Sequence, residues 1–563
     1  MSDTVVLQVY DTTLRDGTQR EGLSFTVEDK ISVARTLDRL GVHFIEGGWP
    51  GANPKDTEFF RLAKAGELKL KTARLSAFSS TRRPGVTADN DLNLRAVVAS
   101  GAGVCAVFGK SWDLHVTGAL QTDLEENLRM IEESVRFLKR HGLYVIFDAE
   151  HFYDGYRHYP NYALKTLAAA EAGGADVLAL CDTNGGSLPD NVAEATREVA
   201  QRTSTPLGIH AHNDGGLAVA NTLAAVTAGA VHVQGTINGY GERCGNADLC
   251  VVLPNLELRM GRTTIGREAI KHLVEVSRFV GETANLGADA HQPFVGRSAF
   301  AHKGGVHVSA LLKDPTTYEH MDPATVGNKR RVVISELAGA SNVRYKLGEY
   351  GLMPPIAGAG SARAAEGAAG IAAESAVEGP VESAADRTVR AVTAAVKELE
   401  YDGYSFEGAE GTFELLFRRQ LGLAAEFFRL EGFRVTVQKG LTGATGALGC
   451  EATVKVVVGG RTIHTVAEGD GPVNALDNAL RQALRVAYPE LDGVRLTDYK
   501  VRVLDGKAGT ASKVRVHIES SGFGRSWGTV GVSENIIAAS WEALVDGMNY
   551  GLLLTRARLE AGG

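Results

Sequence analysis

The sequence has few cysteines, no excess of positive charge and no long apolar run. Its 5 cysteines are scattered over 563 residues without a C-x-x-C pair, so they indicate neither a disulfide framework nor a thiolate metal site. We therefore expect reduced thiols in a cytoplasmic protein. The formal net charge of −8 gives no electrostatic footprint for nucleic acid. No stretch approaches the roughly 18 consecutive apolar residues that span a bilayer, so neither nucleic acid nor a membrane is an expected partner.

The chain does have enough apolar material for more than one core. Hydrophobic residues make up 44% and charged residues 22% of the sequence, which is ordinary for soluble globular proteins. Its 563 residues exceed an ordinary domain of roughly 100–200 residues. The first residues enter a strand-like run directly, without the charged and long apolar regions of a signal peptide. We expect several domains and a small-molecule substrate.

Residues 1–260 alternate short apolar runs with amphipathic stretches, a pattern that favours βα units around a parallel sheet. Eight such units match the size of a TIM barrel, the (β/α)8 member of the α/β class, and a doubly wound open sheet is the alternative. Helices are expected over 27–40 and 124–140, for example. The expected strands are residues 5–13, 44–49, 72–78, 104–109, 144–150, 177–183, 207–213 and 231–238.

Four further regions follow the expected barrel. Residues 261–353 are interpreted as a helical linker subdomain. Residues 354–386 consist mainly of Ala, Gly, Glu and Ser, too poor in large apolar side chains to pack well, so we expect a flexible insertion. Residues 387–431 form a second helical subdomain, with one helix expected over 412–428. Residues 432–563 show two βββα-like halves, which predicts a C-terminal α+β domain with an internal duplication and a binding or regulatory role.

Polar residues gather at the carboxyl ends of the expected strands, where a barrel builds its active site. This placement favours the barrel over the open sheet. The residues at or just beyond these ends are Asp16, Glu150, Thr183, His210 and His212.

The segment H-A-H-N-D at 210–214 carries the strongest local signal. His210 and His212 stand two residues apart on an expected strand, so their side chains project to the same face and bring their nitrogens near one point. A single histidine in a strand is more often structural. Two at this spacing, at the end of a strand, favour metal ligation.

The segment D-T-T-L-R-D-G-T-Q at 11–19 ends the first expected strand. Because the first strand neighbours the last ones in a closed barrel, Asp16 can face His210 and His212 across the rim. Two imidazoles and a carboxylate leave open positions on an octahedral ion, at which a 2-oxo acid can chelate. The alternative is that Arg15 and Asp16 form a surface turn.

A third segment, N-G-Y-G-E-R-C-G-N-A-D at 238–248, follows the last strand and is rich in glycine, so its backbone can approach a ligand closely. Asn246 can add a carbonyl ligand to the metal. Glycine-rich loops are common, and alone the segment indicates little. Cys244 is expected to be a packing residue.

Together, D-T-T-L-R-D-G-x-Q, H-x-H-N-D and N-G-x-G-E-R-x-G-N resemble the DRE-TIM metallolyase superfamily, and within it the 2-isopropylmalate, homocitrate and citramalate synthases, over nearly the whole chain. The stretch I-E-G-G-W-P-G-A-N-P-K-D at 45–56 is most similar to the long citramalate synthases. G-D-G-P-V-N-A-L-D at 469–477 resembles their regulatory domain, which implies isoleucine, or leucine, as an effector.

The resemblance also implies roles for individual residues. Arg15 and Gln19 lie beside the oxo acid, and Thr183 hydrogen-bonds its carboxylate. His307 and Tyr318 match a His–Tyr pair supplied by the partner subunit, so the linker subdomain completes the active site and a homodimer is expected. The residues that match the site of one divalent ion, Mg, Mn or Zn, are Asp16, His210, His212 and Asn246.

The reaction implied by the resemblance is a Claisen condensation of acetyl-CoA with pyruvate and water, which gives (R)-citramalate and CoA in isoleucine biosynthesis. The base that removes the acetyl proton is Glu150 or a member of the His307–Tyr318 pair. Alternatives are 2-oxoisovalerate as acceptor, which makes 2-isopropylmalate, and, less favoured, 2-oxoglutarate. A metal-dependent C–C lyase and a non-catalytic amino-acid sensor are two further alternatives.

Overall fold

The structure, a computed structural model, describes residues 6–335, 338–352, 384–439 and 448–562. The chain divides into two compact units, of which the first comprises Met1–Phe300 with Met321–Arg330 and the second Ala301–His320 with Arg331–Gly563. Most of the insertion expected at 354–386 lies outside the described residues, and its last three residues belong to a helix. Among the described helices, none is long and apolar enough to cross a membrane.

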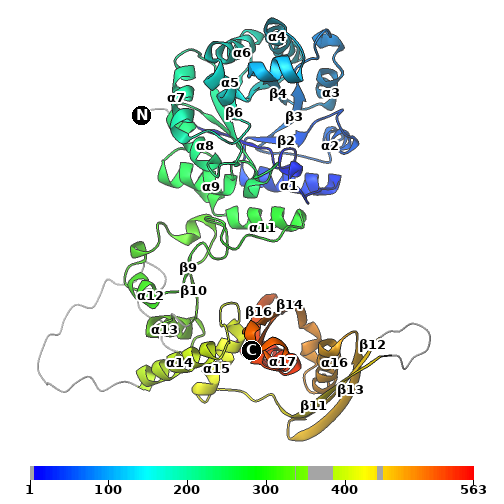
Figure 1. Cartoon of the computed structure of the whole chain (residues 1–563), viewed down its shortest axis with the longest axis vertical. Coiled ribbons are helices and arrows are strands. Elements are labelled where there is room, and N and C mark those ends of the chain that lie inside the picture. Colours follow the sequence, from blue (N-terminus) through cyan, green and yellow to red (C-terminus); the bar gives the residue numbers. More distant parts are fainter. Residues whose placement is uncertain (1–5, 336–337, 353–383, 440–447, 563) are drawn as a thin grey trace, which may run out of the picture. The chain divides into compact units, whose positions relative to one another are not determined.

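The first unit is built on a closed barrel of eight parallel strands in sequential order (Figure 1). The last strand pairs with the first, with Gln8 opposite His232 and Asp11 opposite Gly235, so the sheet has no edge. The barrel prediction is confirmed, and the open-sheet alternative was wrong. The strands are β1 Gln8–Asp11, β2 Phe44–Gly48, β3 Arg74–Ser80, β4 Val104–Lys110, β5 Tyr144–Glu150, β6 Val177–Asp182, β7 Leu207–Ala211 and β8 His232–Gly235.

Helices between the strands cover the outside of the barrel. Thr26 and Asp29 form a capping box at the start of α1, and Gly41 ends it in the left-handed conformation with φ 93°. The helices expected over 27–40 and 124–140 are confirmed as α1 and α4. The main helices of the barrel are α1 Val27–Leu40, α2 Pro54–Lys64, α3 Leu92–Ser100, α4 Leu124–Arg140, α5 Phe152–His158, α6 Pro160–Gly173, α7 Pro189–Ala200, α8 Ala218–Thr227 and α9 Leu249–Pro254.

The segment after the barrel combines short helices with loops and contributes to both units. Its first helices stay with the barrel unit, and the part from Ala301 to His320 belongs to the second unit. Two short parallel strands, β9 and β10, pair Ala301 with Arg331 within that unit. The elements are α10 Arg267–Ile270, α11 Leu273–Thr283, β9 Ala301–His302, α12 Gly305–Leu311, β10 Arg331–Val332 and α13 Ala340–Glu349.

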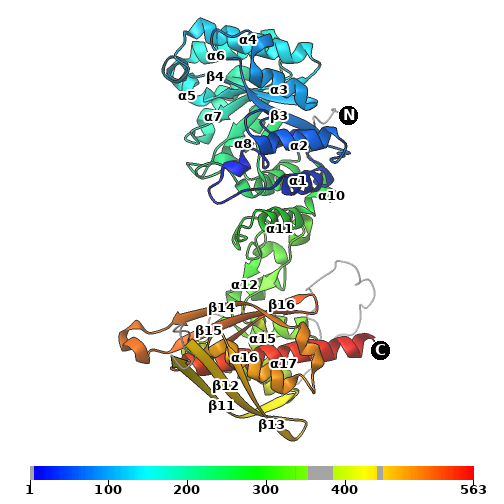
Figure 2. The same cartoon turned by 90° about the vertical axis from the view of Figure 1, so that its right-hand side faces the viewer.

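The second unit ends in two βββα halves, as the internal duplication predicts. Each half is a three-stranded antiparallel sheet followed by one helix, and both helices lie between the two sheets (Figure 2). The halves are preceded by α14 Ala384–Tyr401 and α15 Glu410–Gln420. The first half comprises β11 Phe428–Lys439, β12 Leu448–Val458, β13 Arg461–Gly469 and α16 Pro472–Leu484. The second comprises β14 Arg495–Val503, β15 Val514–Gly522, β16 Arg525–Ser533 and α17 Ile536–Gly562.

The helix expected over 412–428 is shorter than predicted. It ends at Gln420, and Gly422 follows with φ 68°, a conformation that terminates helices. The strand β11 then begins at Phe428, so the last residues of the expected helix were assigned wrongly.

Candidate metal centre and active site

The interior of the barrel changes from apolar to polar toward the carboxyl ends of its strands. Along β5, Ile146, Asp148 and Glu150 stand two residues apart and share the inward face. Ile146 is part of a buried apolar cluster, whereas Asp148 and Glu150 line a cavity of about 220 Å³ at the barrel mouth. This mouth cavity is lined by Arg15, Asp16, Gln19, Trp49, Phe78, Phe108, Asp148, Glu150, Cys181, Thr183, His210, His212 and Glu242.

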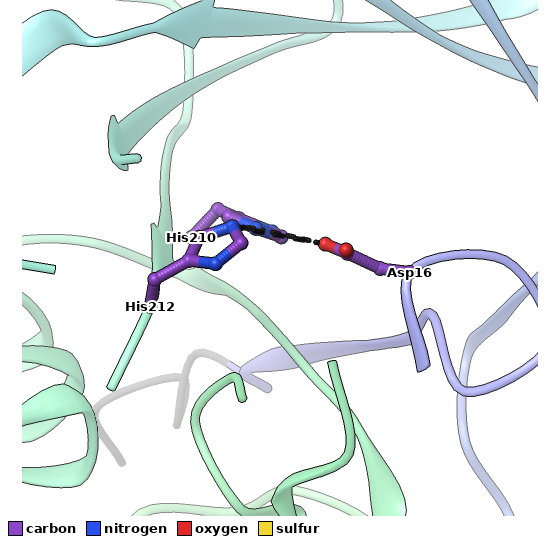
Figure 3. A group of neighbouring side chains, drawn as sticks. All are labelled: Asp16, His210 and His212. Carbon is purple, nitrogen blue, oxygen red and sulfur yellow. Dashed lines mark hydrogen bonds and ion pairs between the residues drawn. The ribbon is translucent and has the colours of Figure 1, made fainter. Parts of the chain in front are cut away.

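Asp16, His210 and His212 meet at this mouth, as the spacing of the motifs predicts. Asp16 follows β1, His210 belongs to β7 and His212 lies just beyond its end. The Nε2 atoms of the two histidines face each other at 3.1 Å and lie 3.3 Å and 3.9 Å from Asp16 Oδ2 (Figure 3). All three residues are buried, and one donor atom of each lies within 4.8 Å of the others.

Several buried polar atoms around this triad lack a hydrogen-bond partner among the described residues. They include Asp16 Oδ1 and both polar side-chain atoms of Asn246, which is joined to His212 by an isolated β-bridge. Asn246 lines a neighbouring cavity together with Arg20 and Tyr240. Buried polar atoms without partners are unfavourable, and this set of nitrogen and oxygen donors fits a divalent ion.

The electrostatics of Asp16 and His212 favour the protonation states that bind metals, whereas the pKa of His210, which burial acts to lower, is raised by the neighbouring Asp16 carboxylate. Burial acts to raise the pKa of Asp16, but the charge of Arg15 and the hydrogen bond with His210 outweigh it, and the pKa lies well below its ordinary value. Burial and the neighbouring His210 lower the pKa of His212 to about 3. At neutral pH an ionised carboxylate therefore faces a neutral imidazole, the two forms that ligate metals.

Arg15 is held at the mouth by Glu46, which the sequence did not single out. Its Nε donates to Glu46 Oε2 at 2.7 Å, and its guanidinium carbon lies 3.7 Å from the centre of the Phe78 ring. Glu46 is fully buried and also accepts hydrogen bonds from Tyr10 and Thr12. The only sequence signal was an acidic residue inside an otherwise buried strand.

The other pocket residues predicted in the barrel also lie at this mouth. Gln19, Glu150 and Thr183 line the mouth cavity with the triad. Thr183 Oγ1 accepts a hydrogen bond from the backbone of His151 at 2.8 Å. Glu150 forms an ion pair with Lys110, the residue opposite it on β4.

An aromatic wall completes the mouth cavity. Trp49, Phe78 and Phe108 pack against one another, with ring centres 5.3 to 5.7 Å apart. Together with Asp148 and Glu242, these residues line the cavity but were not predicted, since their side chains converge only when the barrel closes.

His307 and Tyr318 belong to the second unit, and the structure brings them next to each other. Their rings are stacked with centres 4.2 Å apart, and both side chains are exposed. His307 lies on α12, and Tyr318 follows the short helix Pro315–Thr317.

The prediction that Cys244 is a packing residue was wrong. The side chain is exposed, because the turn formed by residues 242–244 of the glycine-rich loop is exposed throughout. Arg243, with φ 56°, anchors this turn by pairing with Asp214 at 2.7 Å.

Comparisons with known proteins cover both units. The HMGL-like family matches residues 6–280, the homocitrate synthase post-HMGL domain-like family 294–357 and the LeuA allosteric (dimerisation) domain 407–552. A probable 2-isopropylmalate synthase of Methanopyrus kandleri is 32% identical over 96% of this chain and 98% of its own length. An (R)-citramalate synthase of Geobacter sulfurreducens is 50% identical over 97% of this chain and 98% of its own length. One of Synechocystis sp. is 50% identical over 97% and 96%. The chain therefore belongs to the (R)-citramalate synthase family.

Proposed function

We propose that this chain condenses acetyl-CoA with pyruvate and water to give (R)-citramalate and CoA, an acyltransferase step of isoleucine biosynthesis in the cytoplasm. The observation that carries the proposal is the buried triad of Asp16, His210 and His212 at the mouth cavity. It lies in a chain that is 50% identical to (R)-citramalate synthases over nearly its whole length.

One divalent ion, Mg, Mn or Zn, would be held by Asp16, His210 and His212, with Asn246 as a fourth ligand. When bound, such an ion supplies positive charge that polarises the keto group of a 2-oxo acid. The buried, unpaired atoms of Asp16 and Asn246 support this assignment.

Arg15, Gln19 and Thr183 orient the oxo acid. Arg15 is fixed by Glu46 and Phe78, so its charge stands ready to offset the negative charge that develops on the keto oxygen. Thr183 Oγ1 accepts from a backbone N–H, which leaves its own hydrogen free to donate to the carboxylate of the substrate.

Removal of the acetyl proton needs a positioned base. Glu150 is suited to this role because it is a carboxylate that lines the mouth cavity. The second candidate is the stacked pair of His307 and Tyr318, contributed by the partner subunit of a homodimer. Exchange of the acetyl-CoA methyl protons with deuterated water separates the two: the base is the group whose replacement, as Glu150→Gln or His307→Asn, abolishes the exchange.

The C-terminal domain is proposed to bind isoleucine, or leucine, as a feedback effector. The match of residues 407–552 to the LeuA allosteric (dimerisation) domain supports both the effector role and the homodimer.

The acceptor panel is the test of the proposal. The purified chain is incubated with acetyl-CoA, a divalent ion and pyruvate, 2-oxoisovalerate or 2-oxoglutarate, and the release of free thiol is followed. Pyruvate is expected to have the highest kcat/KM, by at least about 10-fold, since one methylene group in an apolar pocket is worth roughly 10–200-fold and the other two acceptors each have two more carbons. The wall of Trp49, Phe78 and Phe108 favours this small acceptor.

Each other outcome points to a different function. Preference for 2-oxoisovalerate would make the chain a 2-isopropylmalate synthase. Cleavage of a C–C bond without any condensation would make it a lyase. Intact metal binding without acetyl-CoA-dependent turnover would favour an amino-acid sensor.

A further inference from the structure

We infer that Gln234 and Asp148 form a hydrogen-bond relay that fixes the tautomer of His210 and so strengthens the binding of a divalent ion at the barrel mouth. Both are positioning residues in this inference, since they act through His210. The inference rests on the metal site of the proposed function and deepens it. Gln234 lies on β8 and is almost completely buried.

The first step is the orientation of the Gln234 amide, which has a donor end and an acceptor end. Its Nε2 donates to Asp148 Oδ1 at 2.8 Å. Burial raises the pKa of Asp148 to about 6, so this carboxylate is still ionised at pH 7.5 and can only accept. The amide oxygen of Gln234 must then point the other way, toward His210.

A second contact favours the same orientation. His232 Nδ1 lies 3.3 Å from Gln8 Oε1, which can only accept, so the hydrogen of the neutral His232 ring sits on Nδ1. His232 Nε2 is then an acceptor and faces Gln234 Nε2 at 3.5 Å. A flipped Gln234 amide would place its oxygen against two acceptors.

The second step is the proton on His210. Its Nδ1 lies 2.9 Å from Gln234 Oε1, and an amide oxygen can only accept, so Nδ1 carries the hydrogen. In the neutral ring Nε2 then carries the lone pair. Nε2 is also the atom that faces Asp16 Oδ2 and His212 Nε2. The relay therefore presents the ligating nitrogen of His210 in its metal-binding form.

The two histidines differ in this respect. The Nδ1 of His212 is buried and makes no hydrogen bond to any residue that the structure describes. Only His210 thus has its tautomer set by a side chain, and partners of this kind are worth roughly 10–100-fold in metal affinity or activity.

The test measures the affinity for Mn²⁺ alone, by competition with a chelating dye at pH 7.5. Gln234→Met keeps the length of the side chain but removes the acceptor, and is expected to weaken Mn²⁺ binding about 10–100-fold. Gln234→Glu keeps an oxygen acceptor for His210 and is expected to lose less affinity than Gln234→Met. In ¹⁵N spectra of histidine-labelled, metal-free protein, the Nδ1–H signature of His210 is expected in the wild type and not in Gln234→Met.

The matched control is Asn127→Leu, which removes another buried amide from the barrel unit without touching the triad. Equal affinities of Gln234→Met and the wild type would overturn the relay, and so would equal losses in Gln234→Met and Asn127→Leu. If Gln234→Met does not fold, the relay is tested by the Mn²⁺ affinity of Gln234→Glu and by the ¹⁵N spectrum of the wild type. Absence of the Nδ1–H signature of His210 in the wild type would then overturn the relay. If the wild type binds no Mn²⁺, the proposed function itself is contradicted. If the wild type binds Mn²⁺ and releases thiol from acetyl-CoA, but Gln234→Met binds Mn²⁺ equally well, only the relay is contradicted.

Discussion

The barrel mouth and the C-terminal halves bury side chains of opposite kinds. At the mouth, ionisable groups lie in the interior and form ion pairs with one another. In one such pair, Arg15 Nε lies 2.7 Å from Glu46 Oε2. Between the two C-terminal sheets, the shared core is apolar and includes Val454, Leu480 and Trp541.

The difference indicates what each region is built for. Taking charges out of water is unfavourable unless every charge is paired, and a well-packed apolar core is at least as stabilising. The barrel mouth buries five ionisable residues together, and they serve its chemistry rather than its stability. They are Asp16, Glu46, Asp148, His210 and His212. The apolar core of the C-terminal halves stabilises a scaffold instead.

The largest contrast is expected from the same substitution in the two regions. Asp16→Asn should lower kcat by more than about 100-fold, because partners outside the ligand shell are already worth about 10–100-fold. Asp477→Asn, on α16, removes only the charge that pairs with Arg481 and should leave kcat little changed. Thiol release from acetyl-CoA with pyruvate measures both. Near-normal turnover by Asp16→Asn would contradict the claim that the buried charges of the barrel mouth serve catalysis.

The next largest contrast concerns how much a charge pair in each region contributes to the free energy of unfolding. Glu46→Gln leaves the largely buried guanidinium of Arg15 without its closer counter-charge, and Asp16 remains at 3.7 Å, so the expected cost is up to about 3–5 kcal/mol. Glu431→Gln breaks the more exposed pair with Lys455 on the C-terminal sheet and is expected to cost at most about 1 kcal/mol. Urea unfolding of the full chain gives both values. Similar losses in the two variants would show that burial of the charge pair does not matter.

The apolar core of the C-terminal halves should respond to lost volume. Leu480 is fully buried on α16, so Leu480→Ala is expected to destabilise the second unit by about 2–5 kcal/mol. The Mn²⁺ affinity of the barrel should stay unchanged. A drop in that affinity would contradict the independence of the two regions.

The smallest expected effect concerns pH. Burial raises the pKa of Asp11 to about 7, although Thr13 donates two hydrogen bonds to it. A carboxyl group with a raised folded pKa stabilises the fold fully below its unfolded pKa, and this contribution is lost as the pH rises through 7.

The variant Asp11→Asn cannot titrate, so its Tm should rise by several degrees relative to that of the wild type as the pH increases from 5 to 8. Asp89→Asn, at an exposed site, should show no such trend. A Tm difference that does not vary with pH would mean that Asp11 titrates normally.

Much of the fold could be predicted because local sequence patterns determine where its strands and helices form. The barrel strands follow apolar runs, and α1 has a capping box at Thr26 and a left-handed glycine at Gly41. The end of α15 was missed because helical periodicity continued past Gly422.

The site was predictable where residues act in motifs. His210 and His212 share one strand face, and Asp16 follows β1, which is separated from β7 only by β8 in the closed barrel. Glu46 and Gln234 lie singly on inward faces of β2 and β8, and each acquires its partners only when distant strands come together. No local sequence pattern predicts the roles of such residues.

The central claim is that the triad of the barrel mouth binds one divalent ion that turnover requires. The most direct measurement removes metal from the purified chain with a chelator, adds Mn²⁺ back in steps, and follows both bound metal and the release of thiol from acetyl-CoA with pyruvate. Thiol release should vanish in the metal-free protein and saturate at one ion per chain, and Asp16→Asn should neither bind nor respond. Full turnover by the metal-free protein, or metal binding unaffected by Asp16→Asn, would contradict the claim.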